Sequence, residues 1–254
     1  MARITCNFFS TTLRVSTAIT VLLPEPADGQ IGVTGSGSDA APPVLYLLHG
    51  LSDDETIWTR HTSIERYVSK LGLAVVMPRA GRSFYQDEAY GSAYWSFLTE
   101  ELPEMVQRFF RVSDRPEDTF VAGLSMGGYG AFRMALTHPD RFGAAASLSG
   151  ALDVAHPDQA ALWADEVPQV LAGAPVPADV DLMALLRGAA RDALPPLYLA
   201  CGTEDFLYPS NERFLALAAE LGVPVRTELR PGTHEWGFWD ESIQRVLEWL
   251  PLHR

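Results

Sequence analysis

The sequence predicts an α/β fold in which a mostly parallel sheet carries helices on both faces. Apolar residues make up 47% of the 254 residues and charged residues 20%, which is the balance of a globular protein with a large core. Short apolar runs recur without polar alternation, a pattern typical of strands buried on both faces. Amphipathic segments separate most of these runs, and strands that alternate with helices favour a doubly wound parallel sheet.

The first 24 residues predict two strands of a different kind. The stretches RITCNFF and LRVSTAITVLLP are strand-like, and no helical segment lies between them. We therefore expect them to pair antiparallel at one edge of the sheet. Residues 27–43 follow and are rich in Gly, Ser, Ala and Pro, which indicates an exposed loop rather than a linker between domains.

The remaining strands are predicted from a series of apolar runs, which helical patterns accompany. The runs are residues 44–50, 73–80, 119–125, 144–150 and 195–202, with residues 224–232 as a weaker last run. The helical patterns are SIERYVSKLG after the first run, LPEMVQRFFRV before the third, GGYGAFRMALTHPDRF after it, NERFLALAAELG after the fifth and ESIQRVLEWLP at the end. We expect residues 1–254 to form a single domain.

One crossover is longer than a connection between two parallel strands needs. Residues 151–194 contain several prolines and helix-like pieces between two predicted strands. A connection of this length is either a functional cover or an ordinary helical excursion. The sequence leaves open whether this segment is a cap-like insertion over a site.

Charge and hydropathy disfavour two classes of partner. The net charge is −13, and such a surface repels phosphate backbones, so we expect no binding to nucleic acid. The chain has no run of about 18 apolar residues and no recognisable signal peptide, so we expect no membrane partner and a cytoplasmic location. Cys6 and Cys201 share no zinc-site spacing with histidines, and a cytoplasmic setting disfavours a disulfide between them.

The segment GLSMG, residues 123–127, is the motif that indicates chemistry. The pattern G-x-S-x-G alone is a weak signal, but here it follows a predicted strand and opens a predicted helix, as a nucleophile elbow requires. Ser125 would occupy the sharp turn, and the flanking glycines would let neighbouring backbone approach closely. This context predicts an α/β-hydrolase fold with Ser125 as the nucleophile.

A serine nucleophile needs a base, and the base needs an orienting acid. In an α/β-hydrolase the acid follows the serine and the histidine comes last. His234 lies in a loop between the last strand and the last helix, at the sheet edge where ligands bind. His156 falls inside the long crossover, and His253 lies beyond the last helix. His234 is therefore the expected base.

The acid has several candidates. Glu204 and Asp205 stand side by side directly after the apolar run 195–202, at the same predicted sheet edge. Their side chains should diverge, so only one of them should point at the imidazole. Asp153, after the preceding strand, is the position that some related folds use.

The second oxyanion donor of an α/β-hydrolase comes from the loop after the first parallel strand. His49 and Gly50 end that strand here, so the expected donors are the backbone N–H of Leu51 and that of Met126, next to the nucleophile. Two such donors account for several kcal/mol of a reaction barrier. We expect His49 itself to be a structural, hydrogen-bonded residue rather than a base.

Four segments together carry a family resemblance: YLLHGLSDDETIWTR, GLSMGGYGAF, CGTEDFLY and GTHEWGFWD. They resemble the esterase D group of α/β-hydrolases, and within it the bacterial tributyrin esterases, which cleave short-chain acyl esters. The resemblance covers about residues 3–252. Feruloyl esterases, acetyl-xylan esterases and mycolyltransferases share the elbow, but they are usually exported.

The S-formylglutathione hydrolases are close relatives of this group. They share the His-Gly-Leu loop and the Ser-Met-Gly-Gly elbow. They typically carry a Cys shortly after that loop and a His on each side of the elbow core. This sequence has Ser52, Asp53, Leu124 and Tyr129 at those positions. The departure disfavours a formylglutathione substrate.

The resemblance assigns roles to the site residues. It implies Ser125 as the nucleophile, His234 as the base and Asp205 as the triad acid, since the family's Gly-x-x-Asp pattern falls on Gly202 and Asp205. Glu204 is then a solvated or structural neighbour. Leu51 and Met126 would supply the oxyanion donors, and no metal or cofactor is implied.

The expected function is a serine carboxylesterase that hydrolyses small-molecule short-chain acyl esters through an acyl-enzyme. The alternatives are a thioesterase like the S-formylglutathione hydrolases, an acetyl or feruloyl carbohydrate esterase, and a hydrolase fold that only binds a ligand. Among the aromatic residues near the predicted site loops, Trp58 and Trp236 are expected to wall a short acyl pocket. The edge strand and the family resemblance leave a homo-oligomer open.

Overall fold

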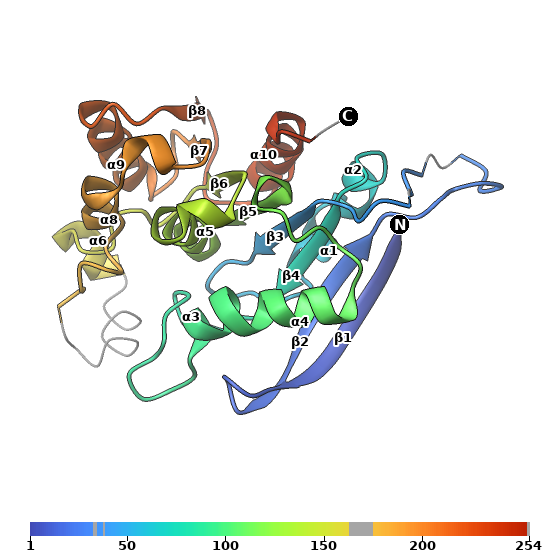
Figure 1. Cartoon of the computed structure of the whole chain (residues 1–254). Helices are drawn as coiled ribbons and strands as arrows, with labels where there is room; N and C mark the ends of the chain where they lie inside the picture. The colour runs from blue at the N-terminus through green and yellow to red at the C-terminus, as the bar shows by residue number, and fades with distance from the viewer. Residues whose placement is uncertain (33–34, 38, 163–174, 253–254) are drawn as a thin grey trace.

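One eight-stranded sheet runs through the centre of the computed structural model, which describes residues 1–32, 35–37, 39–162 and 175–252 (Figure 1). The strands are β1 (Ala2–Ser10), β2 (Val15–Leu23), β3 (Val44–Leu48), β4 (Ala74–Pro78), β5 (Thr119–Leu124), β6 (Ala144–Leu148), β7 (Leu197–Gly202) and β8 (Val225–Arg230). Their order is β1-β2-β4-β3-β5-β6-β7-β8. The strands from β4 to β8 pair in parallel, whereas β1 pairs with β2, and β2 with β4, in antiparallel fashion. The predicted α/β fold with an antiparallel N-terminal edge is confirmed.

Helices and short helical turns connect the strands and cover the sheet. The α-helices are α1 (Ile57–His61), α2 (Ile64–Val68), α3 (Tyr94–Ser96), α4 (Leu102–Phe109), α5 (Met126–Thr137), α6 (Pro157–Leu162), α8 (Leu182–Gly188), α9 (Tyr208–Glu220) and α10 (Trp236–Trp249). A π-helical segment, η1 (Phe97–Glu101), leads directly into α4. The 3-10 turns in the described part of the chain are η2 (Pro116–Asp118), η3 (Pro139–Arg141) and η4 (Arg191–Ala193).

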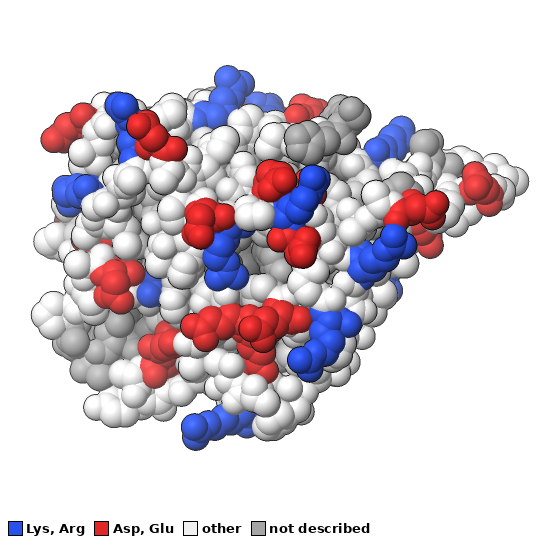
Figure 2. All heavy atoms as spheres, viewed as in Figure 1, with Lys and Arg blue, Asp and Glu red and all other residues white. Residues whose placement is uncertain are grey.

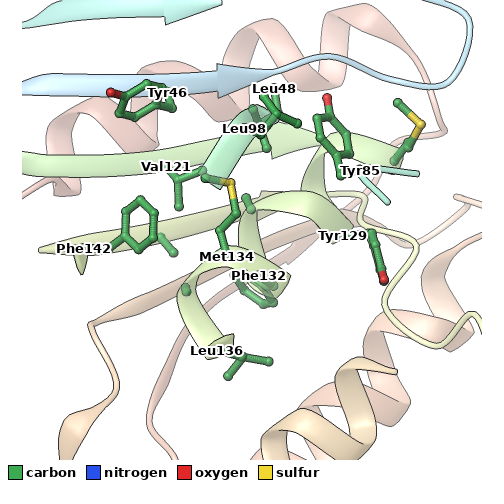
Figure 3. Close-up of a cluster of buried hydrophobic side chains, with 14 of the residues drawn as sticks. Tyr46, Leu48, Tyr85, Leu98, Val121, Tyr129, Phe132, Met134, Leu136 and Phe142 are labelled. Atoms are coloured by element: carbon green, nitrogen blue, oxygen red, sulfur yellow. The ribbon is translucent and has the colours of Figure 1, made fainter. Parts of the chain in front are cut away.

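The hydrophobic core has two parts, one on each face of the sheet. Successive residues of a strand point to opposite faces, so Val121 of β5 packs into one cluster and Phe120 into the other. The Val121 side is covered by α4, α5, α8 and α9, and the Phe120 side by α1, α2 and α10. Figure 3 shows part of the first cluster, in which Phe132 and Met134 come from α5. Burial on both faces explains why the strand runs lack polar alternation.

The long crossover, residues 151–194, is described only in part. Residues 163–174 lie outside the described residues, so the cap-like insertion stays a prediction. The C-terminal part belongs to the core, because Leu182 and Leu186 of α8 are buried against the same cluster as α5. Asp181 caps α8, its carboxylate accepting the backbone N–H of Met183 at 3.0 Å, which satisfies one of the open donors of a helix start.

None of the helices in the described part of the chain has the length and apolar character that crossing a bilayer requires. Within the same residues, no group of three or more His, Cys, Asp and Glu side chains is arranged to hold a metal ion.

Candidate active site

Ser125 lies in the turn between β5 and α5. Its backbone has φ 53° and ψ −116°, a conformation that is strained for any residue other than glycine and that persists only where its surroundings impose it. Two hydrogen bonds hold the residue to the end of β6: its N–H donates to the Leu148 carbonyl at 2.9 Å, and its carbonyl accepts from the Ala151 N–H at 3.2 Å. The predicted elbow is therefore present, and it projects the serine hydroxyl from the carboxyl edge of the sheet.

The glycines of the elbow are required by close backbone contacts. A Cβ on Gly123 would lie 2.3 Å from the carbonyl oxygen of Gly127, and a Cβ on Gly127 would lie 2.6 Å from the carbonyl oxygen of Leu48. Real Cβ atoms do not approach backbone this closely, so α5 can begin directly behind Ser125 only if both positions lack side chains.

Ser125, His234 and Asp205 form one hydrogen-bonded chain. His234 follows β8 and Asp205 follows β7, so parallel strands bring both to the edge that carries Ser125. The Ser125 Oγ lies 3.1 Å from His234 Nε2, and His234 Nδ1 lies 2.9 Å and 3.0 Å from the two carboxylate oxygens of Asp205. With Nδ1–H donating to the carboxylate, Nε2 keeps a lone pair for the serine proton.

The carboxylate of Asp205 is itself fixed. Its side chain is fully buried, while that of His234 is 16% exposed. One of its oxygens also accepts the backbone N–H of Leu207 at 2.8 Å. A buried carboxylate held at two points sets both the tautomer and the orientation of the imidazole.

The loop after β3 is held by a set of buried hydrogen bonds around His49. The His49 Nδ1–H donates to the Gly50 carbonyl at 2.6 Å, and Nε2 accepts the Ala80 N–H at 2.9 Å. Burial lowers the pKa of His49, so the ring stays neutral, as these two bonds require. The Tyr85 hydroxyl donates to the His49 carbonyl at 2.8 Å. His49 is therefore structural, as expected from the sequence.

This loop and the elbow each present a backbone N–H. The Gly50 carbonyl bound by His49 belongs to the same peptide unit as the Leu51 N–H, so that bond also directs the N–H. Within the described residues, the Leu51 N–H donates to no protein acceptor. Met126 is the first residue of α5, so its N–H has no partner inside the helix. Two such N–H groups beside a serine hydroxyl can stabilise an oxyanion.

A comparison with protein-family models matches residues 10–250 to the esterase family described as "Putative esterase". The chain belongs to this esterase family. An acetyl esterase of Caldicellulosiruptor saccharolyticus is 30% identical over 276 residues, and the match covers 98% of each chain. Together with the solved structures below, these matches show that the protein is a carboxylic ester hydrolase.

Solved structures similar to this esterase include other hydrolases. FphF, a fluorophosphonate-binding serine hydrolase of Staphylococcus aureus, has a TM-score of 0.87 and 35% identity, with 98% of each chain covered. The S-formylglutathione hydrolase FrmB, also of Staphylococcus aureus, has a TM-score of 0.84 and 34% identity over 98% of each chain. A ferulic acid esterase has a TM-score of 0.79 and 25% identity, covering 98% of this chain and 97% of the other.

The other described acidic and basic candidates of the esterase, Asp153 and His156, have partners outside this hydrogen-bonded chain. Asp153 forms an ion pair with Arg213 of α9. His156 is half-exposed, and its Nδ1 lies 3.3 Å from the backbone N of Asp158. His253 lies outside the described residues.

Glu204 has a structural role in the esterase. Its carboxylate accepts the Gly232 N–H at 2.6 Å, and its own N–H donates to the Gly232 carbonyl at 3.1 Å. The first of these bonds lowers the pKa of Glu204. A Cβ on Gly202 would lie 2.1 Å from the Gly232 carbonyl oxygen, so the two loops touch through bare backbone. Glu204 thus ties the loop that carries His234 to the loop that carries Asp205.

Trp58 is not placed for the substrate contact expected of it. It is only 1% exposed, and its indole N–H donates to the Leu48 carbonyl at 3.0 Å. Its bulk fills the core beneath the end of β3, so it supports the loop instead of lining an open pocket. Trp236 is half-buried, packs edge-on against Trp58 at 5.4 Å between ring centroids and stacks on His61 at 5.0 Å. Its contact with a substrate stays a prediction.

Two contacts of the site were missed by sequence reasoning. The ring of Phe206 lies 4.5 Å from the imidazole of His234, centroid to centroid, and the ring of Trp239 lies 4.8 Å from it. Phe206 directly follows the candidate triad acid in CGTEDFLY, and this adjacency could have predicted that its ring lies near the site. Trp239 sits five residues after His234, and only the start of α10 turns it back onto the imidazole.

Proposed function

We propose that this esterase hydrolyses short-chain acyl esters by transferring the acyl group from the ester to Ser125 and then to water. The observation that carries the proposal is the continuous hydrogen-bonded chain from Asp205 through His234 to Ser125, next to two available backbone N–H groups. A serine with a base in reach, and a base with a buried orienting acid, is the arrangement that activates a hydroxyl at neutral pH.

In the first step, the Ser125 oxygen attacks the ester carbonyl while His234 Nε2 takes the hydroxyl proton. The carbonyl oxygen becomes an oxyanion, which the N–H groups of Leu51 and Met126 stabilise. The alcohol leaves with the proton from Nε2, and an acyl-enzyme remains. Water then attacks the acyl-enzyme by the reverse route, and the carboxylic acid and free Ser125 are released. The carboxylate of Asp205 stabilises the imidazolium in both steps.

The preference for simple esters is supported by one of the positions at which this chain departs from the S-formylglutathione hydrolases. Tyr129 stands where those enzymes typically carry a histidine, and it is only 1% exposed. Its hydroxyl accepts from Gln86 Nε2 at 2.6 Å and donates to the Val180 carbonyl at 2.6 Å. A side chain whose hydroxyl is bonded in this way is not free to bind the thiol portion of a glutathione thioester.

The test is turnover of p-nitrophenyl esters from acetate to decanoate by the wild type and Ser125→Ala. We expect the highest kcat/KM at short chains, and a loss of at least about a thousandfold in the variant. Ser69→Ala, which alters a serine outside the site, should keep full activity. A Ser125→Ala enzyme that retained more than a few per cent of turnover would contradict the proposal.

A second comparison separates esters from thioesters. A glutathione thioester and a simple acetate ester are assayed in parallel with the wild type. We expect the higher kcat/KM for the acetate ester, and the opposite order would assign the esterase to thioester chemistry.

A further inference from the structure

Phe206 stands out as a large apolar side chain exposed beside the catalytic base. It is 50% exposed although both of its chain neighbours are anchored. Asp205 is buried against His234, and Leu207 is fully buried and donates its N–H to the Asp205 carboxylate. The backbone therefore fixes where the Phe206 ring begins, and the ring lies against His234 at 4.5 Å between centroids with a 51° angle between planes.

The imidazole has a second aromatic neighbour, which is closed to ligands. Trp239 meets His234 edge-on, at 4.8 Å and 87°. It is 5% exposed, and its indole N–H donates to the Ser149 hydroxyl at 3.1 Å. Of the two rings that flank His234, only Phe206 offers an open face.

The direction of proton transfer places the departing alcohol near that face. The alcohol oxygen takes its proton from His234 Nε2, so it must come within about 3 Å of that atom. Its first carbon atoms then extend from the Nε2 side of an imidazole whose centroid is 4.5 Å from that of the Phe206 ring. The acyl group lies elsewhere, because its carbonyl oxygen must reach the N–H groups of Leu51 and Met126.

From these contacts we infer that Phe206 forms the wall of the leaving-group site and gives the esterase a preference for esters of aromatic alcohols. This inference rests on the proposed function. An aromatic alcohol can lie offset or edge-on against the exposed Phe206 ring, an arrangement that contributes beyond simple burial of area. Phe206 is thus a specificity-determining residue for the alcohol, and it has no part in selecting the acyl chain.

The test compares benzyl acetate with ethyl acetate, whose alcohols are similar in acidity and differ by a ring. The kcat/KM ratio of benzyl to ethyl ester is measured for the wild type, Phe206→Ala, Phe206→Leu and a control, Phe109→Ala. Phe109 of α4 is 53% exposed and lies away from the site, so it matches Phe206 in residue type and exposure. We expect the ratio to fall about three- to tenfold in Phe206→Ala and by less in Phe206→Leu, and to stay constant in the control.

An acyl-side measurement checks that the effect is confined to the alcohol. p-Nitrophenyl butyrate and p-nitrophenyl acetate have the same leaving group and differ only in the acyl chain. The ratio of their turnover rates should therefore be the same in Phe206→Ala and the wild type. Melting temperature and phosphonate labelling of Ser125 confirm that the variant is folded and that its nucleophile is active.

Two outcomes separate this inference from the function on which it rests. If both acetates slow equally in Phe206→Ala and the ratio is kept, Phe206 merely holds His234 and the inference is overturned, while an inactive Ser125→Ala still supports the proposed function. If Ser125→Ala hydrolyses both acetates at wild-type rate, the proposed function fails and the inference fails with it.

Discussion

Asp205 and Glu204 are adjacent in the chain, yet their carboxylates have different hydrogen-bond partners and different roles. Asp205 is buried and binds the imidazole, whereas Glu204 is exposed and binds the backbone of Gly232. Residue type alone does not distinguish them. The local turn distinguishes them, because the Leu207 N–H donates to the Asp205 carboxylate and thereby directs that carboxylate inward. In the proposed mechanism the Asp205 carboxylate acts through its charge and by orienting the imidazole, whereas the Glu204 carboxylate joins two loops through its bond to Gly232.

A pair of variants tests this division. Asp205→Asn should lower kcat by about three to four orders of magnitude, because an amide does not favour the tautomer with Nδ1–H and does not stabilise the imidazolium. Glu204→Gln should keep kcat within a few-fold of the wild type, since its amide oxygen can still accept the Gly232 N–H. Both are measured as ester turnover at saturating substrate. Equal losses in the two variants would refute the assignment of the acid to Asp205.

At the scale of elements, the turn between β1 and β2 is bound to the helical segment that precedes α4. Glu101, the last residue of η1, accepts the Ser10 hydroxyl at 2.5 Å, the Thr11 N–H at 2.8 Å and the Thr12 N–H at 3.0 Å. Burial alone would raise the pKa of Glu101, but these hydrogen bonds outweigh it and lower the pKa to about 2. An edge hairpin is marginally stable by itself, so this carboxylate supplies a specific attachment at its turn.

Glu101→Gln should therefore destabilise the esterase in a pH-dependent way. A carboxylate whose pKa is lower in the folded state stabilises above its unfolded pKa, and that stabilisation is lost as the pH falls through the folded value. Discounted for partial exposure, the effect at neutral pH is about 1 kcal/mol, or about 2–4 °C in melting temperature. The difference from the wild type should shrink between the ordinary value of 4.5 and about 2.

Glu100→Gln is the matched control for this experiment. Glu100 is the preceding residue and is exposed, and its side chain makes no hydrogen bond or ion pair within the described residues. Glu100→Gln should have the same melting temperature as the wild type at every pH. A deficit in Glu101→Gln that stayed constant from neutral pH down to pH about 3 would show that the ionised carboxylate is not the cause.

The elements that sequence reasoning found best are those whose pattern reflects burial. The runs for β3 to β7 are buried on both faces, so the sequence is continuously apolar there. β8 is an edge strand in which every residue is exposed or only partly buried, which explains its weaker signal. The order of Ser125, Asp205 and His234 followed from the fold. The bonds of His49 to Ala80 and of Glu101 to the hairpin turn join distant segments, and no local pattern encodes them.

For the whole molecule, the relevant property is charge. The net charge is −13. Figure 2 shows acidic side chains gathered along the region of α4 on one face, with basic side chains scattered singly around them. The active-site edge carries further acids in its loops, among them Asp53, Glu204 and Glu235. Such a distribution repels anions over distances that salt controls, so it should act on substrate approach as well as on nucleic acids.

The esterase should accordingly respond to ionic strength in a way that depends on substrate charge. With 4-acetoxybenzoate, an anionic ester, kcat/KM should rise about two- to fivefold when salt increases from about 10 mM to about 150 mM, because the Debye length falls from about 30 Å to about 8 Å. The methyl ester of the same acid is neutral, and its acetate group should be hydrolysed at a rate that salt leaves unchanged. Each substrate is compared only with itself at two salt concentrations, so intrinsic reactivity cancels.

Since the electrostatic field acts on the encounter of ester and enzyme and not on the bound ester, the salt effect should appear in kcat/KM and leave kcat constant. Parallel responses of the two esters would mean that salt acts on the protein itself rather than on the approach of a charged substrate.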